Sequence, residues 1–369
     1  MKIPFVDLKK HHAKIKKEIQ KAINSVVETN AYIMGPELKK FELDFAKFCN
    51  VKYSVGVNSG SSGLFLALKA LGVKQGDEVI TVANTFIATA QAISMCGAKI
   101  KFVDVDEKTC LMDAKKLERA ITKKTKVILP VHLYGQICDM KLIMKIAKKY
   151  GVKVLEDACE SHGAKQNGKK QIFGDLVVYS FYPSKNLGAF GDAGAVVTNN
   201  LKLYEKVLAL RDYGRKKGAE YLHEEEGFNM RMDSLQAAVL NVKLKYLNKW
   251  NSQRRNHVKL YNKFLKDLVI IPSEEKNNDH VYYVYVIQVN KRAELMKFLS
   301  SKGVGVKIHF PIPIYSQPQY TCLKVNKKSF SNTEKISKKI LSLPMFPELT
   351  DKQIKYVCQQ INNFYSKNS

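Results

Sequence analysis

The sequence predicts an α/β protein whose sheet is mostly parallel and covered by helices on both faces. Apolar runs of strand length take turns with segments of helical period from residue 53 to residue 213, and small or polar turns follow several of these runs. A chain of 369 residues is long enough for two domains. We expect a large domain over residues 1–250 and a smaller C-terminal α+β domain over residues 251–369.

The individual elements follow from the spacing of the apolar residues. Ile15, Ile19 and Ile23 recur on one face of an amphipathic helix over residues 8–30, and a second helix follows the turn at 33–37. Strands are expected at 53–57, 78–83, 99–104, 126–131, 152–156, 176–181 and 195–198. Helices that alternate with them are expected at 86–96, 113–122, 139–150 and 201–213.

A long helix from Asp233 is expected to join the sheet to the C-terminal domain, because Leu235, Val239 and Val242 start an apolar stripe that runs on to Leu268. The C-terminal domain then has expected strands near 281–289 and 304–309. Its expected helices lie near 292–301, 331–340 and 351–366. Prolines make the segment that follows His309 rigid, so it could project into a cleft, where a histidine is as often structural as catalytic.

The net charge of +27 raises the question of a nucleic-acid partner. The excess is almost wholly lysine, whereas arginine, the usual reader of guanine edges, is scarce. No DNA- or RNA-binding motif is visible. We therefore expect no nucleic-acid partner and ascribe the charge to lysines on solvated helix faces, whose field would also favour an anionic substrate. A basic nucleic-acid-binding protein stays the alternative from another class of function.

No segment of the sequence predicts a membrane span or a metal site. No run approaches the ~20 apolar residues that a membrane helix needs. Met1–Asp7 lacks the charged start and apolar core of a signal peptide. The seven cysteines are scattered and form no CxxC pair. We therefore expect a cytoplasmic protein without a membrane contact, a disulfide framework or a bound metal.

The turn between the strands expected at 176–181 and 195–198 holds one lysine, Lys185, among a proline and three glycines. A lysine in a tight turn between buried strands would be poorly hydrated. Desolvation disfavours the ammonium and lowers its pKa, which suits a nucleophile that bonds covalently to a carbonyl carbon. An ordinary solvated loop lysine is the alternative, and it is the common case in a lysine-rich chain.

A second turn whose residues could bind a ligand runs from Asn58 to Gly63, after the strand expected at 53–57. Serines and glycines that lead into a helix N-terminus offer backbone amides, hydroxyls and the positive end of the helix dipole, so this turn can cradle a phosphate. A simple N-cap by Ser61 or Ser62 explains the same residues. The turn lacks the lysine of a P-loop and the spacing of a dinucleotide site.

Asp157 follows the apolar run at 152–155, and burying its carboxylate is costly unless it meets a cation or a donor. Helix capping is one explanation. The other is a partner for a protonated ring nitrogen, as pyridoxal phosphate requires of an aspartate. The Ser61 turn, Phe86, Asp157 and Lys185 all come just after expected strands, where ligands of parallel sheets bind. We therefore favour a cofactor site at this edge.

These residues together resemble the nucleotide-sugar aminotransferases of the DegT/DnrJ/EryC1/StrS family, which have the aspartate aminotransferase fold (fold type I of the pyridoxal phosphate enzymes). The resemblance covers nearly the whole chain, and its motifs are specific in combination. They are Ile33-Met34-Gly35, Gly60-Ser61-Ser62-Gly63-Leu64, Asn84-Thr85-Phe86, Glu156-Asp157-Ala158-Cys159, Ser180-Phe181-Tyr182-Pro183-Ser184-Lys185-Asn186, Gly227-Phe228-Asn229-Met230-Arg231-Met232-Asp233, His309-Phe310-Pro311 and Ser342-Leu343-Pro344. The resemblance favours the functional interpretation of Lys185 over the solvated one.

The resemblance implies that Lys185 binds pyridoxal 5′-phosphate covalently and then moves protons between the substrate carbon and the cofactor. It also implies that Asp157 pairs with the ring nitrogen and that Phe86 stacks on the ring. Three residues after the aspartate the family usually has Gln, whose amide contacts the phenolic oxygen of the cofactor. This chain has Glu160 there, and its carboxylate would repel a phenolate unless the pKa of the acid is raised.

The remaining site residues are also implied by the resemblance. The cofactor phosphate is expected to contact Ser61, Ser62 and Ser180, joined by Asn229 from the other subunit of a homodimer with shared active sites. Substrate contacts are expected from Tyr182 and His309 and, at the sugar diphosphate, from Tyr213 and Arg215.

The substrate is implied by the branch of the family. Relatives with His in place of Lys185 are dehydratases or deoxygenases, so the lysine argues against them. The segment 181–194 looks most like the branch that aminates C3 of dTDP-3-keto-6-deoxyhexoses, giving dTDP-3-amino-3,6-dideoxyhexoses with glutamate as amino donor. Amination at C4 of a UDP- or dTDP-4-keto-6-deoxy sugar is the alternative within the class.

Overall fold

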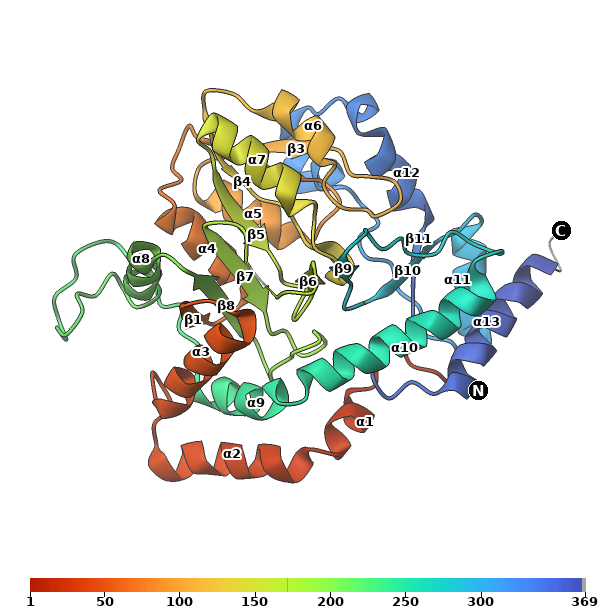
Figure 1. Cartoon of the computed structure of the whole chain (residues 1–369), viewed down its shortest axis with the longest axis horizontal. Coiled ribbons are helices and arrows are strands. Elements are labelled where there is room, and N and C mark those ends of the chain that lie inside the picture. Colours follow the sequence, from red (N-terminus) through yellow and green to blue (C-terminus); the bar gives the residue numbers. More distant parts are fainter. Residues whose placement is uncertain (171, 367–369) are drawn as a thin grey trace.

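The computed structural model describes residues 1–170 and 172–366. Its largest sheet has seven strands in the order β1-β8-β7-β5-β4-β2-β3 (Figure 1). These strands are β1 (Tyr53–Val57), β2 (Glu78–Val82), β3 (Lys99–Val103), β4 (Thr125–Ile128), β5 (Lys153–Asp157), β7 (Leu176–Ser180) and β8 (Gly194–Thr198). β8 is antiparallel to both of its neighbours, and the other adjacent pairs of this sheet are parallel. The predicted α/β class with a mostly parallel sheet is confirmed.

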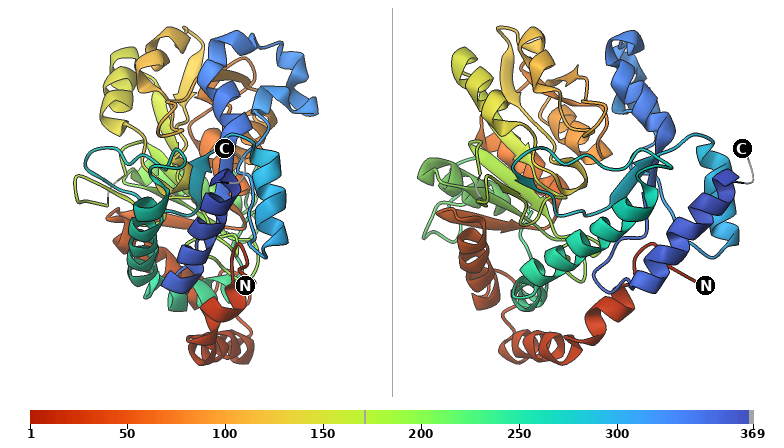
Figure 2. Two further views of the ribbon diagram at one scale, coloured as in Figure 1. Left: turned by 90° about the vertical axis from the view of Figure 1, so that its right-hand side faces the viewer. Right: turned by 45° about the vertical axis from the view of Figure 1, so that its right-hand side comes forward.

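Helices cover both faces of this sheet, as the views in Figures 1 and 2 show. Along β7, Val177 belongs to an apolar core shared with α3 (Pro36–Cys49), whereas the next residue, Val178, belongs to the core shared with α4 (Gly60–Ala70). Successive side chains of a strand point to opposite faces, so two covered faces require an apolar residue at every position. This arrangement explains the continuous apolar runs by which the strands were predicted.

The other helices and short elements complete the chain. The remaining α-helices are α1 (Leu8–Ala13), α2 (Lys16–Thr29), α5 (Ile87–Met95), α6 (Ala114–Leu117), α7 (Met140–Tyr150), α8 (Leu201–Arg211), α9 (Ser234–Leu244), α10 (Leu247–Leu265), α11 (Arg292–Ser301), α12 (Ser331–Lys339) and α13 (Asp351–Ser366). Short 3-10 helices lie at Glu118–Ala120, Leu133–Gly135, Ile314–Ser316, Pro318–Leu323 and Lys327–Phe330. In the described part of the chain, no helix combines the length and the apolar character that crossing a bilayer requires.

A smaller sheet pairs β10 (Tyr285–Gln288) with β11 (Ile340–Leu343) in antiparallel register, and the two-residue strands β6 (Lys165–Gln166) and β9 (Asn278–Asp279) form a third pair. Helices α10, α11 and α13 contribute to a second apolar core beside β10 and β11. The start of the chain joins this core, because Ile3 pairs with Val304. The predicted domain boundary after residue 250 falls inside α10, and the division into two domains stays a prediction.

Two helices that were predicted as continuous are broken in the structure. The helix expected over 8–30 divides into α1 and α2, where Ile15 N donates to His12 O (3.1 Å). The helix expected from Asp233 divides into α9 and α10, where Tyr246 N donates to Lys243 O (3.0 Å). The apolar period continues across both breaks, so it predicted one helix where a tight turn changes the direction of the chain (Figure 1).

The strands of the C-terminal part also differ from the prediction. The segment 304–309 forms no regular strand, because Val304 pairs with Ile3 and Lys307 pairs with Ser342 as isolated bridges. One segment thus divides its backbone pairing between two partners. Ser342 lies in β11, a strand that the sequence analysis did not predict and that begins where the helix expected at 331–340 was to end.

The strand expected at 281–289 is shortened to β10 for a reason that concerns the site. The amides of Val281 and Tyr283 donate to Gly135 O (3.0 Å) and Tyr134 O (2.9 Å), both of which follow β4 of the large sheet. Their backbone groups therefore pair with the large sheet's loop rather than with β11. This pairing ties the C-terminal part to the carboxyl edge of the large sheet.

Candidate active site

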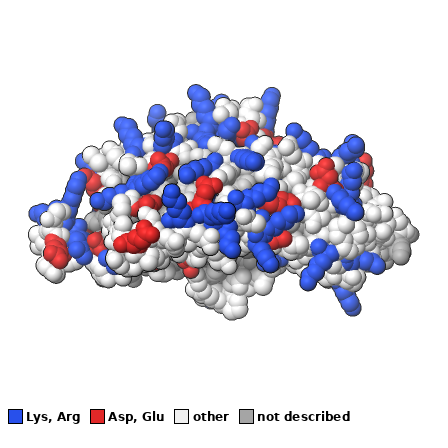
Figure 3. Space-filling view, turned by 90° about the horizontal axis from the view of Figure 1, so that it is seen from below, with Lys and Arg blue, Asp and Glu red and all other residues white. Residues whose placement is uncertain are grey.

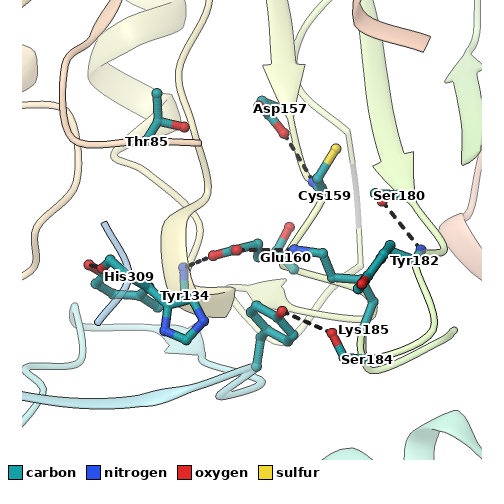
Figure 4. A network of polar contacts seen from close by, with 12 residues as sticks. Thr85, Tyr134, Asp157, Cys159, Glu160, Ser180, Tyr182, Ser184, Lys185 and His309 are labelled. Carbon is teal, nitrogen blue, oxygen red and sulfur yellow. Dashed lines mark hydrogen bonds and ion pairs between the residues drawn. The ribbon is translucent and has the colours of Figure 1, made fainter. Parts of the chain in front are cut away.

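The strands β1, β2, β5 and β7 run in one direction and end at one edge of the large sheet. The segments that follow these strands hold the residues singled out in the sequence. Figure 4 shows Thr85 after β2, Asp157 at the end of β5, and Ser180 and Lys185 at and after the end of β7. Strand direction therefore gathers side chains that are far apart in the sequence, as expected for a parallel sheet.

Lys185 is paired with a carboxylate. Its Nζ lies 3.0 Å from Glu160 Oε1, and Glu160 Oε2 accepts a hydrogen bond from Tyr134 N (2.8 Å) (Figure 4). The ammonium also lies 4.1 Å from the ring centroid of Tyr283, a cation–π distance. Burial is the largest influence and would by itself lower the pKa of Lys185, but the Glu160 carboxylate, together with Tyr283 and Cys159, outweighs burial and raises the pKa above its usual value. The prediction of a lowered pKa is wrong for this state of the lysine.

Asp157 is buried, with 4% of its surface exposed. Its Oδ2 accepts from Thr89 Oγ1 (2.9 Å), and its Oδ1 accepts from Cys159 N (3.2 Å). Among the described residues no cation pairs with this carboxylate, and burial raises its pKa. A buried carboxylate with two donors and no cation is a suitable partner for a protonated ring nitrogen.

The helix that follows β1 begins earlier in the sequence than predicted. Helix α4 begins at Gly60, and Ser59 is its N-cap, with Oγ accepting from Ser62 N (3.0 Å). Capping by Ser61 or Ser62 was therefore wrong, because both lie in the first helical turn. Ser61 is exposed, and the Ser62 hydroxyl lies 2.9 Å from the Ser59 hydroxyl.

Glycine lets this helix N-terminus approach the end of β7. A Cβ on Gly60 would lie 2.6 Å from Ser180 Cβ, and a Cβ on Gly194 would lie 2.6 Å from the Ser59 backbone. Neither contact is sterically possible, so only glycine permits the approach. Ser180 thus stands beside an open helix N-terminus, which is a favourable place for a phosphate.

Aromatic and imidazole groups border this region. Phe86 precedes α5, is 55% exposed, and has its ring 5.8 Å from that of Phe310. His309 accepts from Tyr134 Oη through its carbonyl oxygen, and its Nδ1 lies 2.8 Å from Ser342 Oγ. Burial lowers the pKa of His309, so the ring is neutral near pH 7. Tyr182 is 55% exposed on the other side of Lys185 in Figure 4.

Tyr213 and Arg215 are not brought to Lys185 within one chain. They lie in the loop that follows α8, which projects from the molecule in Figure 1. Arg215 Nε pairs with Asp212 Oδ2 (3.3 Å), inside the same loop. Asn229, at the end of this loop, is exposed, and the adjacent Met230 O accepts from Asn58 N (3.1 Å), just before the phosphate turn.

Sequence reasoning missed several residues of the site. Tyr134 follows the strand predicted at 126–131, and its place at the carboxyl edge of the sheet was a usable signal. Thr89, the donor to Asp157, lies in the predicted helix at 86–96 without a distinguishing pattern. Tyr283 comes from the C-terminal part, and no local pattern indicates its contact with Lys185. In the described residues, no group of three His, Cys, Asp or Glu side chains could hold a metal ion.

The site fits the three polar parts of pyridoxal phosphate. The Lys185 amine can meet the aldehyde carbon, the Asp157 carboxylate can meet the ring nitrogen, and the N-terminus of α4 beside Ser180 can meet the phosphate. The close approach at Gly60 and the carboxylate without a cation are the two observations on which this fit depends. Fold and site together define an aminotransferase of the aspartate aminotransferase fold.

Comparison with known proteins gives the same class and a family. The family model described as "DegT/DnrJ/EryC1/StrS aminotransferase family" matches residues 13–362, and the chain belongs to this family. The chain is 42% identical to the "Pleiotropic regulatory protein" of Geobacillus stearothermophilus, over 99% of both chains. It is 41% identical to the dTDP-3-amino-3,6-dideoxy-alpha-D-galactopyranose transaminase of Aneurinibacillus thermoaerophilus, over 98% of this chain and 99% of that protein.

A solved structure agrees in fold over nearly the whole chain. DesV of Streptomyces venezuelae, in complex with a ketimine intermediate, superposes with a TM-score of 0.96, at 37% identity and with 98% of each chain covered. Further relatives are named for UDP- and GDP-linked sugars. The protein is therefore a pyridoxal phosphate-dependent sugar-nucleotide aminotransferase.

Proposed function

We propose that this enzyme converts a dTDP-3-keto-6-deoxyhexose to the dTDP-3-amino-3,6-dideoxyhexose, with glutamate as amino donor and 2-oxoglutarate as the second product. Amino transfer is supported by the Lys185 amine, whose side chain is 13% exposed, at the same sheet edge as the buried Asp157. The C3 position is supported by the segment 181–194 and by the relative named as a dTDP-3-amino-3,6-dideoxy sugar transaminase. Amination at C4 of a UDP- or dTDP-4-keto-6-deoxy sugar is the competing proposal, since relatives are named for other nucleotides.

The roles of the cofactor-binding residues are part of this proposal. When bound, pyridoxal phosphate supplies an electron sink for the substrate carbon that loses a proton. Lys185 bonds to the cofactor and, when released from it, takes and returns that proton. Asp157 keeps the ring nitrogen protonated, and Phe86 covers one face of the ring. Glu160 faces Lys185 at 3.0 Å, so we assign it as the counter-ion of the released ammonium in place of the amide contact expected from Gln.

The anionic ends of cofactor and substrate are assigned to separate groups. Ser61, Ser62 and Ser180 bind the cofactor phosphate, and Asn229 of the partner subunit completes this site in a homodimer. The sugar nucleotide contacts Tyr182 and His309 near Lys185, whereas Tyr213 and Arg215 reach its diphosphate. Tyr213 and Arg215 belong to the loop after α8, which projects from the molecule in Figure 1, and this projection supports a site shared between subunits.

The position of amination is tested by the reverse reaction. The diphosphate at C1 anchors the substrate, so moving the ketone from C3 to C4 changes its direction relative to Lys185, and one pose does not serve both. The enzyme is given 2-oxoglutarate as acceptor with dTDP-3-amino, dTDP-4-amino and UDP-4-amino 6-deoxy sugars side by side. We expect the highest kcat/KM with a 3-amino sugar. Faster turnover of a 4-amino sugar would refute C3 and leave the cofactor chemistry standing.

The shared site is tested by subunit exchange. Lys185→Ala and Asn229→Ala proteins are each prepared, each is shown to be severely impaired, and the two are mixed under conditions in which exchange is verified. A hybrid dimer has one site in which both residues are intact, so activity should return to a fraction of the wild-type value. No recovery despite proven exchange would count against a partner contribution from Asn229.

A further inference from the structure

The turn that carries Lys185 is held from behind by α9 and α10. Phe190 N donates to Gln236 Oε1 of α9 (2.9 Å), and Asn186 Nδ2 donates to Asn251 Oδ1 of α10 (2.9 Å). A third bond comes from Lys243 of α9, whose Nζ donates to Gly188 O. The turn is compact at this glycine, where a Cβ would lie 2.3 Å from Pro183 O. These three bonds hold the turn from the side of α9 and α10 and add to its own backbone hydrogen bonds, such as that from Ala189 N to Phe181 O (2.7 Å).

Lys243 is unusual among these anchors because it carries an ionisable group in the interior. Only 1% of its surface is exposed. Among the described residues no carboxylate forms an ion pair with its Nζ, whose partners are Gly188 O and His12 Nε2 (3.1 Å). Burial lowers the pKa of Lys243 to about 7, against a weak opposite effect of Glu348. An interior amine without a counter-ion is costly, so it calls for a function that an apolar residue could not fulfil.

The second partner of Lys243 ties the N-terminal helix α1 to the same turn. The His12 ring lies 4.8 Å from the Phe190 ring, so α1 touches the turn through an aromatic contact as well. When Lys243 is an ammonium it donates to His12 Nε2, which requires the ring proton on Nδ1, and burial lowers the pKa of His12 to about 4. The neighbouring His11 is held by Glu348 at 2.9 Å. The charged or titratable groups that interact with Lys243 are thus His11, His12 and Glu348.

We propose that Lys243 is a positioning residue of the active site, which fixes the Lys185 turn by its bond to Gly188 O and couples α1 to that turn through His12. The carbonyl it holds is three residues after Lys185 in a compact turn, so losing the bond lets the Lys185 backbone shift. Small displacements of a reacting group cost rate heavily. This inference goes beyond the choice of sugar and position and holds for amination at C3 or C4.

The test compares Lys243→Met, Lys243→Gln and Lys245→Met in the enzyme loaded with pyridoxal phosphate. Met keeps the length of the side chain without a donor, Gln keeps a donor, and Lys245 is the exposed lysine that follows α9. Two quantities are measured: kcat and KM of the amino transfer, and hydrogen–deuterium exchange of the peptide that covers 183–191. The exchange is repeated without the cofactor, which separates a change in the protein from a change in its loading.

We expect Lys243→Met to lower kcat about tenfold or more, with KM changed less than about twofold, and to speed exchange selectively in 183–191. Lys243→Gln should recover part of kcat, and Lys245→Met should match the wild type. Unchanged kcat and exchange in the Met variant would overturn the proposal. Uniformly faster exchange over the whole chain would overturn it too, because that result indicates a structural role only.

A second variant keeps the proposal testable if Lys243→Met does not fold. His12→Phe retains a ring against Phe190 and removes the acceptor of Lys243, so it weakens the link between α1 and the turn without emptying the interior of α9. Exchange in 183–191 should then rise by a smaller factor, about two- to fivefold. Exchange equal to the wild type in this variant would remove His12 from the proposed link.

Discussion

Two lysines contact the active-site turn, the half-buried Lys185 within it and the buried Lys243 behind it, and their electrostatic environments are opposite. Lys185 meets the Glu160 carboxylate at 3.0 Å, whereas Lys243 meets a carbonyl oxygen and an imidazole nitrogen. Burial disfavours the ammonium of both. For Lys185 the carboxylate outweighs burial and raises the pKa, and for Lys243 burial prevails and lowers the pKa to about 7.

This difference shows that burial by itself does not fix the charge of a lysine. The charge depends on the group that packs against the amine, and that group comes from another part of the chain. Glu160 reaches Lys185 from the segment after β5, and it is oriented by Tyr134 N from the segment after β4. The ion pair keeps the released amine charged and stationary, and Lys243 holds the backbone beside it. In the proposed mechanism Lys185 therefore takes part in the reaction, whereas Lys243 positions the backbone.

Replacing Lys185 should have the largest effect on activity. Lys185→Ala is expected to lower turnover about 10⁴-fold or more, because no other amine in the site can bond to the cofactor and return the proton. The wild-type protein should be yellow. Borohydride reduction followed by peptide mapping should place the label on the peptide that contains Lys185, and Lys245→Ala should retain full activity. A label on another lysine would contradict the assignment.

Replacing the Glu160 carboxylate tests why the pKa of Lys185 is raised whereas that of Lys243 is lowered. Without Glu160's charge, burial prevails at Lys185 as it does at Lys243, so Glu160→Gln should lower the pKa of Lys185 by at least about one unit. The measurement is the pH dependence of acetylation of Lys185 in the cofactor-free protein, read by mass spectrometry, with the exposed Lys245 as internal control. The same pH dependence in wild type and variant would show that the ion pair does not set the pKa.

The ion pair also has a stability consequence with a definite sign. A lysine with a raised pKa in the folded state contributes stability that is fully present below the unfolded pKa, about 10.4, and is lost as pH rises through the raised value. The pKa of Lys243 is lowered in the folded state, so its effect on the pH dependence of stability has the opposite sign. Between pH 7 and about 10.4 the unfolded chain binds more protons at this residue than the folded one, so the contribution of Lys243 to stability increases with pH in that window.

The free energy of unfolding of the wild type should therefore rise relative to that of Lys243→Met by about 1 kcal/mol or more between pH 7 and about pH 10. Urea unfolding at several pH values measures the difference between the two proteins, which cancels the other titrating groups. Lys245→Met serves as the matched exposed control and should follow the wild type. Parallel stability curves for Lys243→Met and wild type would contradict a lowered pKa.

The smallest effect is expected for the exposed lysines, which should contribute only weakly to binding of DNA. Figure 3 shows Lys and Arg spread over one face of the molecule with Asp and Glu among them. Such a surface supports only weak electrostatic contact with nucleic acid, so DNA binding should be sequence-indifferent and should fall steeply between about 50 and 200 mM salt. Fluorescence anisotropy with two unrelated duplexes measures this. Tight, sequence-selective binding at physiological salt would favour the nucleic-acid alternative.

Much of the fold could be predicted because its evidence is local. The strands of the large sheet carry apolar residues on both faces, and all but one were located within one residue of their observed bounds; the strand predicted at 126–131 ends three residues earlier, at Ile128. Where backbone pairing is divided between distant partners the prediction failed. Val304 pairs with Ile3 and Lys307 pairs with Ser342 as isolated bridges, so the strand expected at 304–309 does not form.

The sequence by itself determined the order of strands and helices in the large sheet, the turns that follow its strands and, through its motifs, the family. Tertiary structure alone decided that Lys185 is an ion-paired ammonium and that Lys243, one lysine among many in the sequence, is buried against Gly188. The physical reason is that periodicity and turn chemistry depend on neighbours along the chain. The charge state of a side chain depends on desolvation and on the groups that packing brings within a few ångströms.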